Sequence, residues 1–406
     1  MKEAKIDFIT GGTITSPHGF CAGATYAGIK KKADRGLDLG ILFSEAPCVT
    51  AGLLTTNRIR SAPVILCRDR LQKGRVLALI ANSGCANAYT GEQGLADAAE
   101  MAALTAQSIG ISPEDVLVAS TGVTGQPLPM NLIRDGINKV VLSRDGGHEL
   151  AQAIMTTDTI PKEAAVSVRI NDTQLTIGGI AKGSGMIHPE LATMFCFLAT
   201  DAAVELEFIR SALRKAVDIS FNMISIDGDM SPSDTVLIMA NGLAGNRPIS
   251  AGSQQADTFQ QALDWVCIYL AKAIARDGEG ATKLIEVTVN GAASLTDARL
   301  AARTIVSSPL VKTAVHGADP NWGRIIAAVG RSGAEVVESN IDLFIGDVGV
   351  LKGGRPLPFS EQSAVRALEQ NEVSISLHFN LGTASATAWG CDLSREYVAI
   401  NSQYMT

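Results

Sequence analysis

Closely spaced cysteine pairs are absent from this chain. Its seven cysteines stand far apart, are odd in number and include no Cys-x-x-Cys pair. Disulfide frameworks belong mainly to small secreted domains, and structural zinc sites need closely spaced ligands. Both classes are therefore disfavoured, and no metal site is expected. The cysteines are Cys21, Cys48, Cys67, Cys85, Cys196, Cys267 and Cys391.

Long apolar runs and basic runs are also lacking. No stretch approaches the roughly 18 uncharged apolar residues of a membrane span, and residues 1–7 lack the apolar core of a signal peptide. The net charge is −7, without the basic stripe of a nucleic-acid binder. We therefore expect a cytoplasmic protein that binds neither membranes nor nucleic acids. At 406 residues, 46% hydrophobic and 18% charged, it is long enough for two or three folded domains.

Histidine is scarce, with five in the whole chain, and none lies beside a Gly-x-Ser-x-Gly elbow. A Ser-His-Asp hydrolase is therefore disfavoured. The dinucleotide-binding Gly-x-Gly-x-x-Gly pattern and the Walker Gly-Lys-Ser/Thr pattern are missing too. Chemistry that depends on a histidine base or a bound nucleotide is not indicated.

Alternating strand and helix patterns are present instead. Apolar runs predict strands at 75–80 and 116–119, each followed by a small polar loop, at 82–87 and 120–125. Helical spacing predicts helices over 94–109, 202–217, 259–274 and 296–306, the last with a Thr296 cap. Alternation predicts strands at 284–289 and 373–379, and a soft domain boundary at 280–292. Three carboxylates within 227–234 favour a turn or capping role over calcium, because the spacing of a calcium loop is absent.

The stretch from Lys182 to Phe195 suggests a nucleophile. It places two glycines within three residues after the lysine and has Ala192-Thr193 before an apolar run. A threonine hydroxyl needs a base. If the Ala192–Thr193 bond is cut, the new α-amine, with a pKa of roughly 7.7–8, supplies that base. Spacing alone favours a buried structural threonine over a nucleophile.

Motifs along the whole chain resemble the ornithine acetyltransferase family, the glutamate N-acetyltransferases of arginine biosynthesis. The stretch Lys182-Gly-Ser-Gly-Met-Ile…Ala-Thr193-Met resembles the processing and active-site motif of that family. The other motifs follow in the family's order: Thr55-Thr-Asn-Arg58, Asn82-Ser-Gly, Ser120-Thr-Gly-Val, Met155-Thr-Thr-Asp-Thr159, Asp227-Gly-Asp-Met-Ser, Ala275-Arg-Asp-Gly-Glu-Gly-Ala, Asp319-Pro-Asn-Trp-Gly-Arg324 and Ile400-Asn…Tyr-Met-Thr406.

The resemblance implies a role for each matching residue. Thr193 would be the self-processed nucleophile, and the chain would be cut between Ala192 and Thr193. Thr121 and Gly122 would form the oxyanion hole. The substrate site would be lined by Thr157, Lys182, Thr193, Glu279, Asn401 and Thr406. As a compact cation, Lys182 suits a carboxylate or a developing oxyanion, and Glu279 suits the distal ammonium of ornithine.

The same resemblance implies a layered α+β fold of the ornithine acetyltransferase and DmpA-like type. It would be processed into an alpha chain, 1–192, and a beta chain, 193–406, which would assemble as an α2β2 heterotetramer. Acetyl would pass from N-acetylornithine to glutamate without a cofactor, and acetyl-CoA would be a further possible donor. Two alternatives remain: an N-terminal-nucleophile hydrolase or aminopeptidase of related fold, and a non-catalytic protein in which Thr193 is buried.

Overall fold

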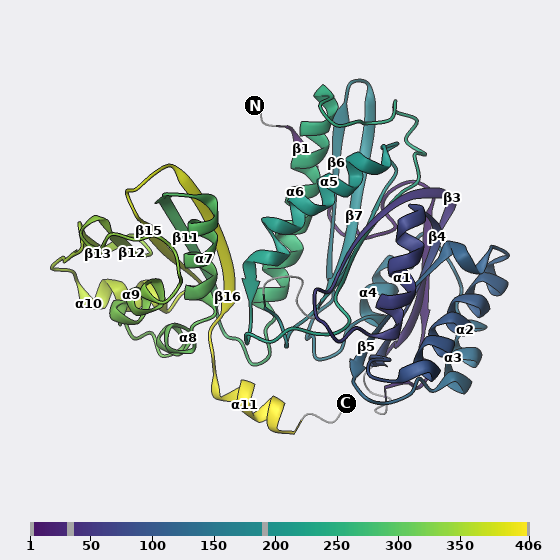
Figure 1. The fold of residues 1–406 in the computed structure, drawn as a ribbon, viewed down its shortest axis with the longest axis horizontal. Coiled ribbons are helices and arrows are strands. Elements are labelled where there is room, and N and C mark those ends of the chain that lie inside the picture. The colour runs from purple at the N-terminus through teal and green to yellow at the C-terminus, as the bar shows by residue number, and fades with distance from the viewer. Residues whose placement is uncertain (1–3, 31–35, 189–193, 404–406) are drawn as a thin grey trace.

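Two β-sheets with helices on their faces form the chain. The computed structural model describes residues 4–30, 36–188 and 194–403. Figure 1 shows a larger unit around one sheet on the right and a smaller unit around the other on the left. Helix α6 (Gln254–Arg276) stands between them, and helix α11 (Arg395–Ser402) lies below both. This layered α+β architecture confirms the predicted fold class.

The larger sheet has nine strands in the order β1-β6-β7-β8-β10-β3-β4-β5, with β2 paired to β3. Most neighbours are antiparallel, but β8 pairs with β10 and β4 with β5 in parallel. The strands are β1 (Ile6–Phe8), β2 (Phe20–Thr25), β3 (Leu39–Leu54), β4 (Arg75–Cys85), β5 (Val116–Val123), β6 (Lys162–Ile170), β7 (Thr173–Lys182), β8 (Phe195–Thr200) and β10 (Thr235–Ala240).

Helices cover both faces of this sheet. One buried cluster joins α1 and α4 to β8, and a second lies under α2 and α3. A third runs from α5 and α6 into the smaller unit, so the two units share one hydrophobic core. Besides α6, the helices of the larger unit are α1 (Ala62–Lys73), α2 (Gly91–Ile109), α3 (Met130–Ile137), α4 (Gly147–Ala153) and α5 (Leu206–Asp218), with short 3-10 turns η2 (Pro113–Asp115) and η3 (Phe221–Met223).

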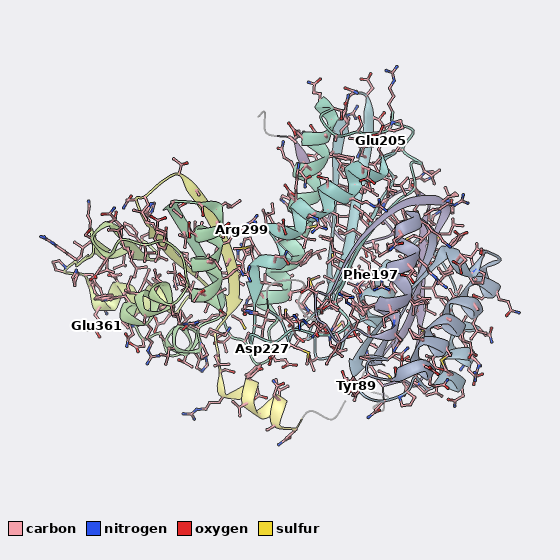
Figure 2. All side chains as sticks on the ribbon, in the orientation of Figure 1. Tyr89, Phe197, Glu205, Asp227, Arg299 and Glu361 are labelled. Carbon is pink, nitrogen blue, oxygen red and sulfur yellow. The ribbon has the colours of Figure 1, made fainter. Side chains whose placement is uncertain are left out.

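The smaller sheet has seven strands in the order β14-β13-β12-β15-β11-β16-β9. Its strands are β9 (Ile224–Ser225), β11 (Leu284–Ala292), β12 (Asp342–Ile345), β13 (Val348–Lys352), β14 (Arg355–Pro356), β15 (Glu372–His378) and β16 (Ala384–Cys391). Its helices are α7 (Leu295–Val306), α8 (Pro309–His316), α9 (Trp322–Gly330) and α10 (Glu361–Leu368), with the 3-10 turn η4 (Glu338–Asn340). In Figure 2, Phe197 lies within the larger unit, Glu361 in the smaller one and Asp227 between them.

The structure confirms most predicted elements and corrects three details. Helix α2 ends at the predicted Gly110, which takes the left-handed conformation. The cap of α7 is wrong, because the Ser294 side chain and not Thr296 accepts the hydrogen bond from Asp297 N. The two polar loops are also wrong, because β4 continues to Cys85 and β5 to Val123. Parallel pairing satisfies the backbone of these polar residues, so they extend the sheet.

Candidate active site

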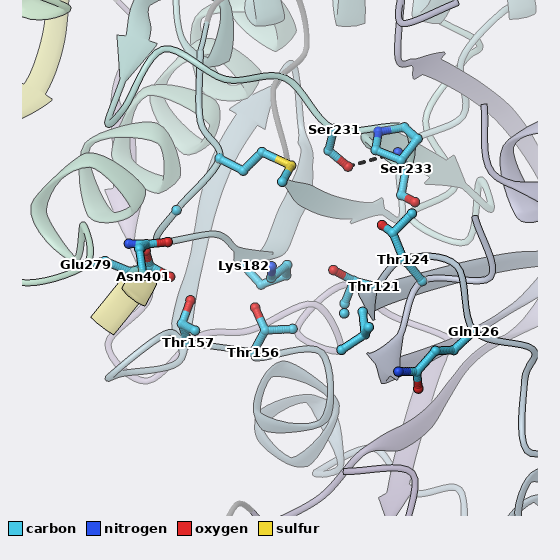
Figure 3. Close-up of a pocket in the computed structure, with 16 residues that line it drawn as sticks. Thr121, Thr124, Gln126, Thr156, Thr157, Lys182, Ser231, Ser233, Glu279 and Asn401 are labelled. Atoms are coloured by element: carbon cyan, nitrogen blue, oxygen red, sulfur yellow. Dashed lines mark hydrogen bonds between the residues drawn. The ribbon is translucent and has the colours of Figure 1, made fainter. Parts of the chain in front are cut away.

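A pocket of about 570 Å³ opens where the ends of β5 and β7 meet the segments around Thr157, Ser231 and Glu279 and helix α11 (Figure 3). Its walls therefore come from both units. The lining residues are Ala86, Thr121, Gly122, Val123, Thr124, Gln126, Thr156, Thr157, Lys182, Gly185, Met186, Ser231, Pro232, Ser233, Glu279 and Asn401.

This pocket gathers every sequence-predicted site residue that the structure describes. Six residues, separated by up to 280 positions in the chain, share its lining: Thr121, Gly122, Thr157, Lys182, Glu279 and Asn401. The remaining three, Ala192, Thr193 and Thr406, lie outside the described residues.

Thr121 and Gly122 sit on β5 directly beside β4. The parallel register pairs Thr121 with Ser83 and Gly122 with Gly84. Gly122 has φ +126°, and a Cβ there would stand 2.4 Å from the carbonyl carbon of Gly84. Only glycine fits this close approach of two backbones. The narrow β4–β5 edge thus brings main-chain atoms to the pocket wall without side-chain bulk.

Lys182 is the last residue of β7 and is only 3% exposed. No hydrogen bond from its Nζ is found among the described residues, and Figure 3 places the side chain between Thr121 and the Glu279–Asn401 end. Burial lowers the pKa of Lys182 below its ordinary value, and the nearby Asp158 carboxylate offsets only part of this effect. The lysine therefore offers unused donors to a ligand in the pocket.

The opposite end of the pocket is acidic. Asn401 on α11 donates from Nδ2 to Glu279 Oε2 at 2.7 Å, and Glu279 N donates to Ser184 O at 2.7 Å. A Cβ at Gly185 would stand 2.5 Å from Glu279 Oε2, so the glycine makes room for this carboxylate. Thr157 joins the same wall, with its Oγ1 2.6 Å from Ser184 Oγ. This end suits a positively charged ligand group.

The 227–234 segment contributes residues that the sequence did not assign to the site. Ser231 and Ser233 line the pocket. The neighbouring Asp234 accepts from Met194 N at 3.1 Å through Oδ1, while its Oδ2 has no partner in the described part of the chain. Burial raises the pKa of Asp234 well above its ordinary value. The three carboxylates were visible in the sequence, but their partners were too distant along the chain to be identified.

Asp227, at the start of this segment, accepts from Met186 N at 2.6 Å and Ile187 N at 2.9 Å. It thereby fixes the backbone that follows Lys182, in agreement with the predicted turn role. Within residues 4–30, 36–188 and 194–403, no group of three or more His, Cys, Asp or Glu side chains is arranged to hold a metal. No helix in these ranges is long and apolar enough to cross a membrane.

Comparison with known proteins places the chain in a family. The ArgJ family model matches residues 21–406. The arginine biosynthesis bifunctional protein ArgJ of Dehalococcoides mccartyi is 53% identical over 100% of both chains. Its counterpart from Symbiobacterium thermophilum is 52% identical over 99% of this chain and 100% of the relative.

A crystal structure of ArgJ from Bacillus halodurans is 46% identical and covers 52% of this chain and 98% of the solved chain, with a TM-score of 0.50. These matches confirm the ornithine acetyltransferase identification made from the sequence motifs. This chain, with its pocket at the β4–β5 edge, belongs to the ArgJ family.

Proposed function

We propose that this chain transfers acetyl from N2-acetylornithine to glutamate through an acetyl ester on Thr193. The observation that carries the proposal is the convergence of Thr121, Gly122, Lys182 and Glu279 on one pocket. The names of its relatives, arginine biosynthesis bifunctional proteins, point to the same pathway.

The described residues that directly follow Thr193 in the chain lie beside this pocket. Phe195 pairs with Lys182 across β7 and β8, and Met194 N is bound to Asp234 beside the pocket residue Ser233. The residues after the proposed nucleophile are therefore fixed next to the pocket wall, which is what supports assigning Thr193 to this site. Self-cleavage after Ala192 would free the α-amine of Thr193, which could then act as the base, so no histidine is needed.

Two half-reactions follow from this arrangement. The Thr193 hydroxyl attacks the acetyl carbonyl of N-acetylornithine, its proton passes to the α-amine, and ornithine leaves with that proton. The glutamate amine then attacks the ester, and the threonine regains its proton. Thr121 and Gly122 would stabilise the oxyanion in each step, an effect of about 10²–10³ in rate per donor. Glu279 would bind the distal ammonium of ornithine, and Thr157, Asn401 and Thr406 would complete the substrate wall.

Cleavage would yield pieces 1–192 and 193–406, which we propose assemble as an α2β2 heterotetramer. The Bacillus halodurans chain is covered to 98% yet matches only 52% of this chain, the share expected of one piece. The soft boundary at 280–292 would divide the second piece. The intact mass of the purified protein tests this: two masses that sum to the whole chain plus one water are expected. A single intact mass would contradict self-cleavage.

The acyl transfer itself is tested by supplying N-acetylornithine with and without glutamate. We expect N-acetylglutamate to form at the rate at which ornithine appears, and acetate release to be slow. Acetate release at full rate without glutamate would instead identify a hydrolase with water as acceptor. Thr193→Ala should stay uncut and inactive, whereas Thr193→Ser should keep part of both activities. Replacing N-acetylornithine by acetyl-CoA in the same assay tests the second donor.

A further inference from the structure

A buried cluster of two carboxylates and one lysine lies directly behind the pocket. Lys162 Nζ is 2.7 Å from Asp158 Oδ1 and 2.6 Å from Asp277 Oδ2. The side chains of Lys162 and Asp158 are fully buried, and that of Asp277 is 6% exposed. Such a cluster is costly to bury unless each group is hydrogen-bonded.

Asp158 also holds the two segments that carry pocket residues. Its Oδ1 accepts from Gly183 N at 2.6 Å, and its Oδ2 accepts from Thr156 N at 3.0 Å. Gly183 follows Lys182, and Thr156 precedes Thr157. One carboxylate therefore links the end of β7 to the threonine wall.

Asp277 makes the corresponding link on the other side of Lys162. It accepts from Thr159 N at 3.0 Å and from the Thr159 hydroxyl, and it stands two residues before Glu279. The cluster thus ties three distant segments together, but among the described residues the amide of Gly183, the residue after Lys182, donates to Asp158 and not to Asp277.

The net charge of this cluster interacts electrostatically with the buried ammonium of Lys182. Two carboxylates and one ammonium leave a net charge of −1, which balances the buried Lys182 cation. The titratable groups that act on Lys182 come from three directions: Asp158 and Lys162 at the cluster, Asp234 before β10, and Glu279 after α6. Because no hydrogen bond from Lys182 Nζ is found within the described part of the chain, this counter-charge leaves its three donors free for a ligand.

We propose that Asp158 is a positioning residue that holds the Lys182 ammonium at the pocket wall, through its hydrogen bond from Gly183 N and its negative charge, and that Asp277 does not share this role. Any catalytic benefit of this arrangement rests on the proposed acyl-transfer function. Its physical content is the coupling of two buried charges, which can be measured without any turnover.

The first experiment compares Asp158→Asn with its matched control Asp277→Asn. Each variant removes one carboxylate charge bonded to Lys162. Burial gives Lys182 a lower pKa in the folded protein than the value of about 10.4 in the unfolded chain. Between these two pKa values the folded protein binds fewer protons than the unfolded chain, so the free energy of unfolding rises with pH. In Asp158→Asn this rise should begin at least about one pH unit lower than in Asp277→Asn, as seen in melting temperatures from pH 6 to 10. Coincident profiles would overturn the proposal.

A second variant covers the case in which Asp158→Asn fails to fold. Coupling is reciprocal, so Lys182→Met should make Asp158 easier to protonate. Its volume is similar, and it removes a buried charge, so this variant should fold. During acidification the loss of stability begins near the unfolded pKa of about 3.9 in both proteins, but in this variant it should end at a pH about one unit or more above that of the wild type. An acid limb that superimposes on the wild type would equally refute the coupling.

Assays of acetyl transfer then distinguish a failure of the Asp158–Lys182 coupling from a failure of the proposed acyl-transfer function. If acetyl transfer is found, the kcat/KM of Asp158→Asn should fall at alkaline pH earlier than that of Asp277→Asn. If no acetyl transfer is found at all, the function fails, while the two stability profiles still decide the coupling.

Discussion

The two sheets differ in where they bury polar groups. In the larger sheet, β4 and β5 carry Asn82, Ser83, Ser120 and Thr121, each at most 4% exposed, at the edge that faces the pocket. In the smaller sheet, β15 alternates buried apolar and exposed polar residues. Buried polar groups that find partners, such as Asn82 Nδ2 on Cys85 O and Ser83 Oγ on Ala153 O, specify one geometry, whereas alternation needs only a core and a solvent face. The larger sheet therefore supplies buried polar residues to the pocket, whereas the smaller unit contributes mainly to the core and reaches the pocket through Asn401 on α11.

Two buried lysines give the sharpest test of this division. Lys182 lines the pocket, and Lys312 in the smaller unit donates to Cys391 O. Lys182→Met should lower kcat/KM by about 10²–10³, because it removes the charged group that we propose donates to the substrate. Lys312→Met should lower the free energy of unfolding by about 1–3 kcal/mol and leave kcat/KM within about twofold. Steady-state kinetics with denaturant unfolding of both variants measures this, and a reversed pattern would remove the distinction between the units.

Two threonines provide a neutral version of the same comparison. Thr121 stands on β5 at the pocket, while Thr288 on β11 has its Oγ1 3.0 Å from that of Thr387. Thr121→Val should lower kcat about a hundredfold, since a donor near the oxyanion is removed. Thr288→Val should cost about 1 kcal/mol of stability without a change in kcat. Equal kcat values for the two variants would rule out Thr121 as a contributor.

Asn401 tests the contribution that the smaller unit's last helix makes to the pocket. Asn401→Ala removes the hydrogen bond to Glu279, and about tenfold in kcat/KM should be lost, mainly through KM for N-acetylornithine. The control Asn380→Ala removes a hydrogen bond to Asn340 O far from the pocket and should leave KM unchanged. A KM for Asn401→Ala equal to that of the control would show that α11 does not shape the substrate site.

The smallest expected effects concern pH. Burial raises the pKa of Asp264 on α6 to about 6. Stability from this group is present below its unfolded pKa of about 3.9 and is lost as pH rises through 6. Asp264→Asn should therefore be more stable than the wild type at pH 8, by on the order of 1 kcal/mol, and no more stable at pH 4.

Asp392, at the end of β16, should show the opposite sign. Burial would raise its pKa, but hydrogen bonds from Thr282, His316 and Lys283 outweigh burial and lower it. Its stabilisation is present above about pH 3.9 and is lost as pH falls further. Asp392→Asn should be less stable than the wild type at pH 7, with the difference shrinking towards pH 3. Melting curves of both variants that changed in the same direction with pH would disprove these assignments.

Local patterns in the sequence were enough to find the helices, because helix periodicity and the Gly110 stop depend on neighbouring residues. They were not enough for the ends of β4 and β5. Small polar residues favour turns in isolation, and only the parallel partner strand makes them extended. The family motifs identified six pocket residues, but the Asp158–Lys162–Asp277 cluster was missed because its two carboxylates are 119 positions apart.

In the larger sheet, strands from before and after Thr193 are interleaved, and this order determines how easily the two pieces could dissociate after cleavage. β8 and β10, which follow Thr193, lie between β7 and β3, which precede it. After a break following Ala192, the two pieces would remain joined by the backbone hydrogen bonds between β7 and β8 and between β10 and β3. The pieces could separate only by dismantling the sheet, so partner exchange between differently labelled molecules should be as slow as global unfolding.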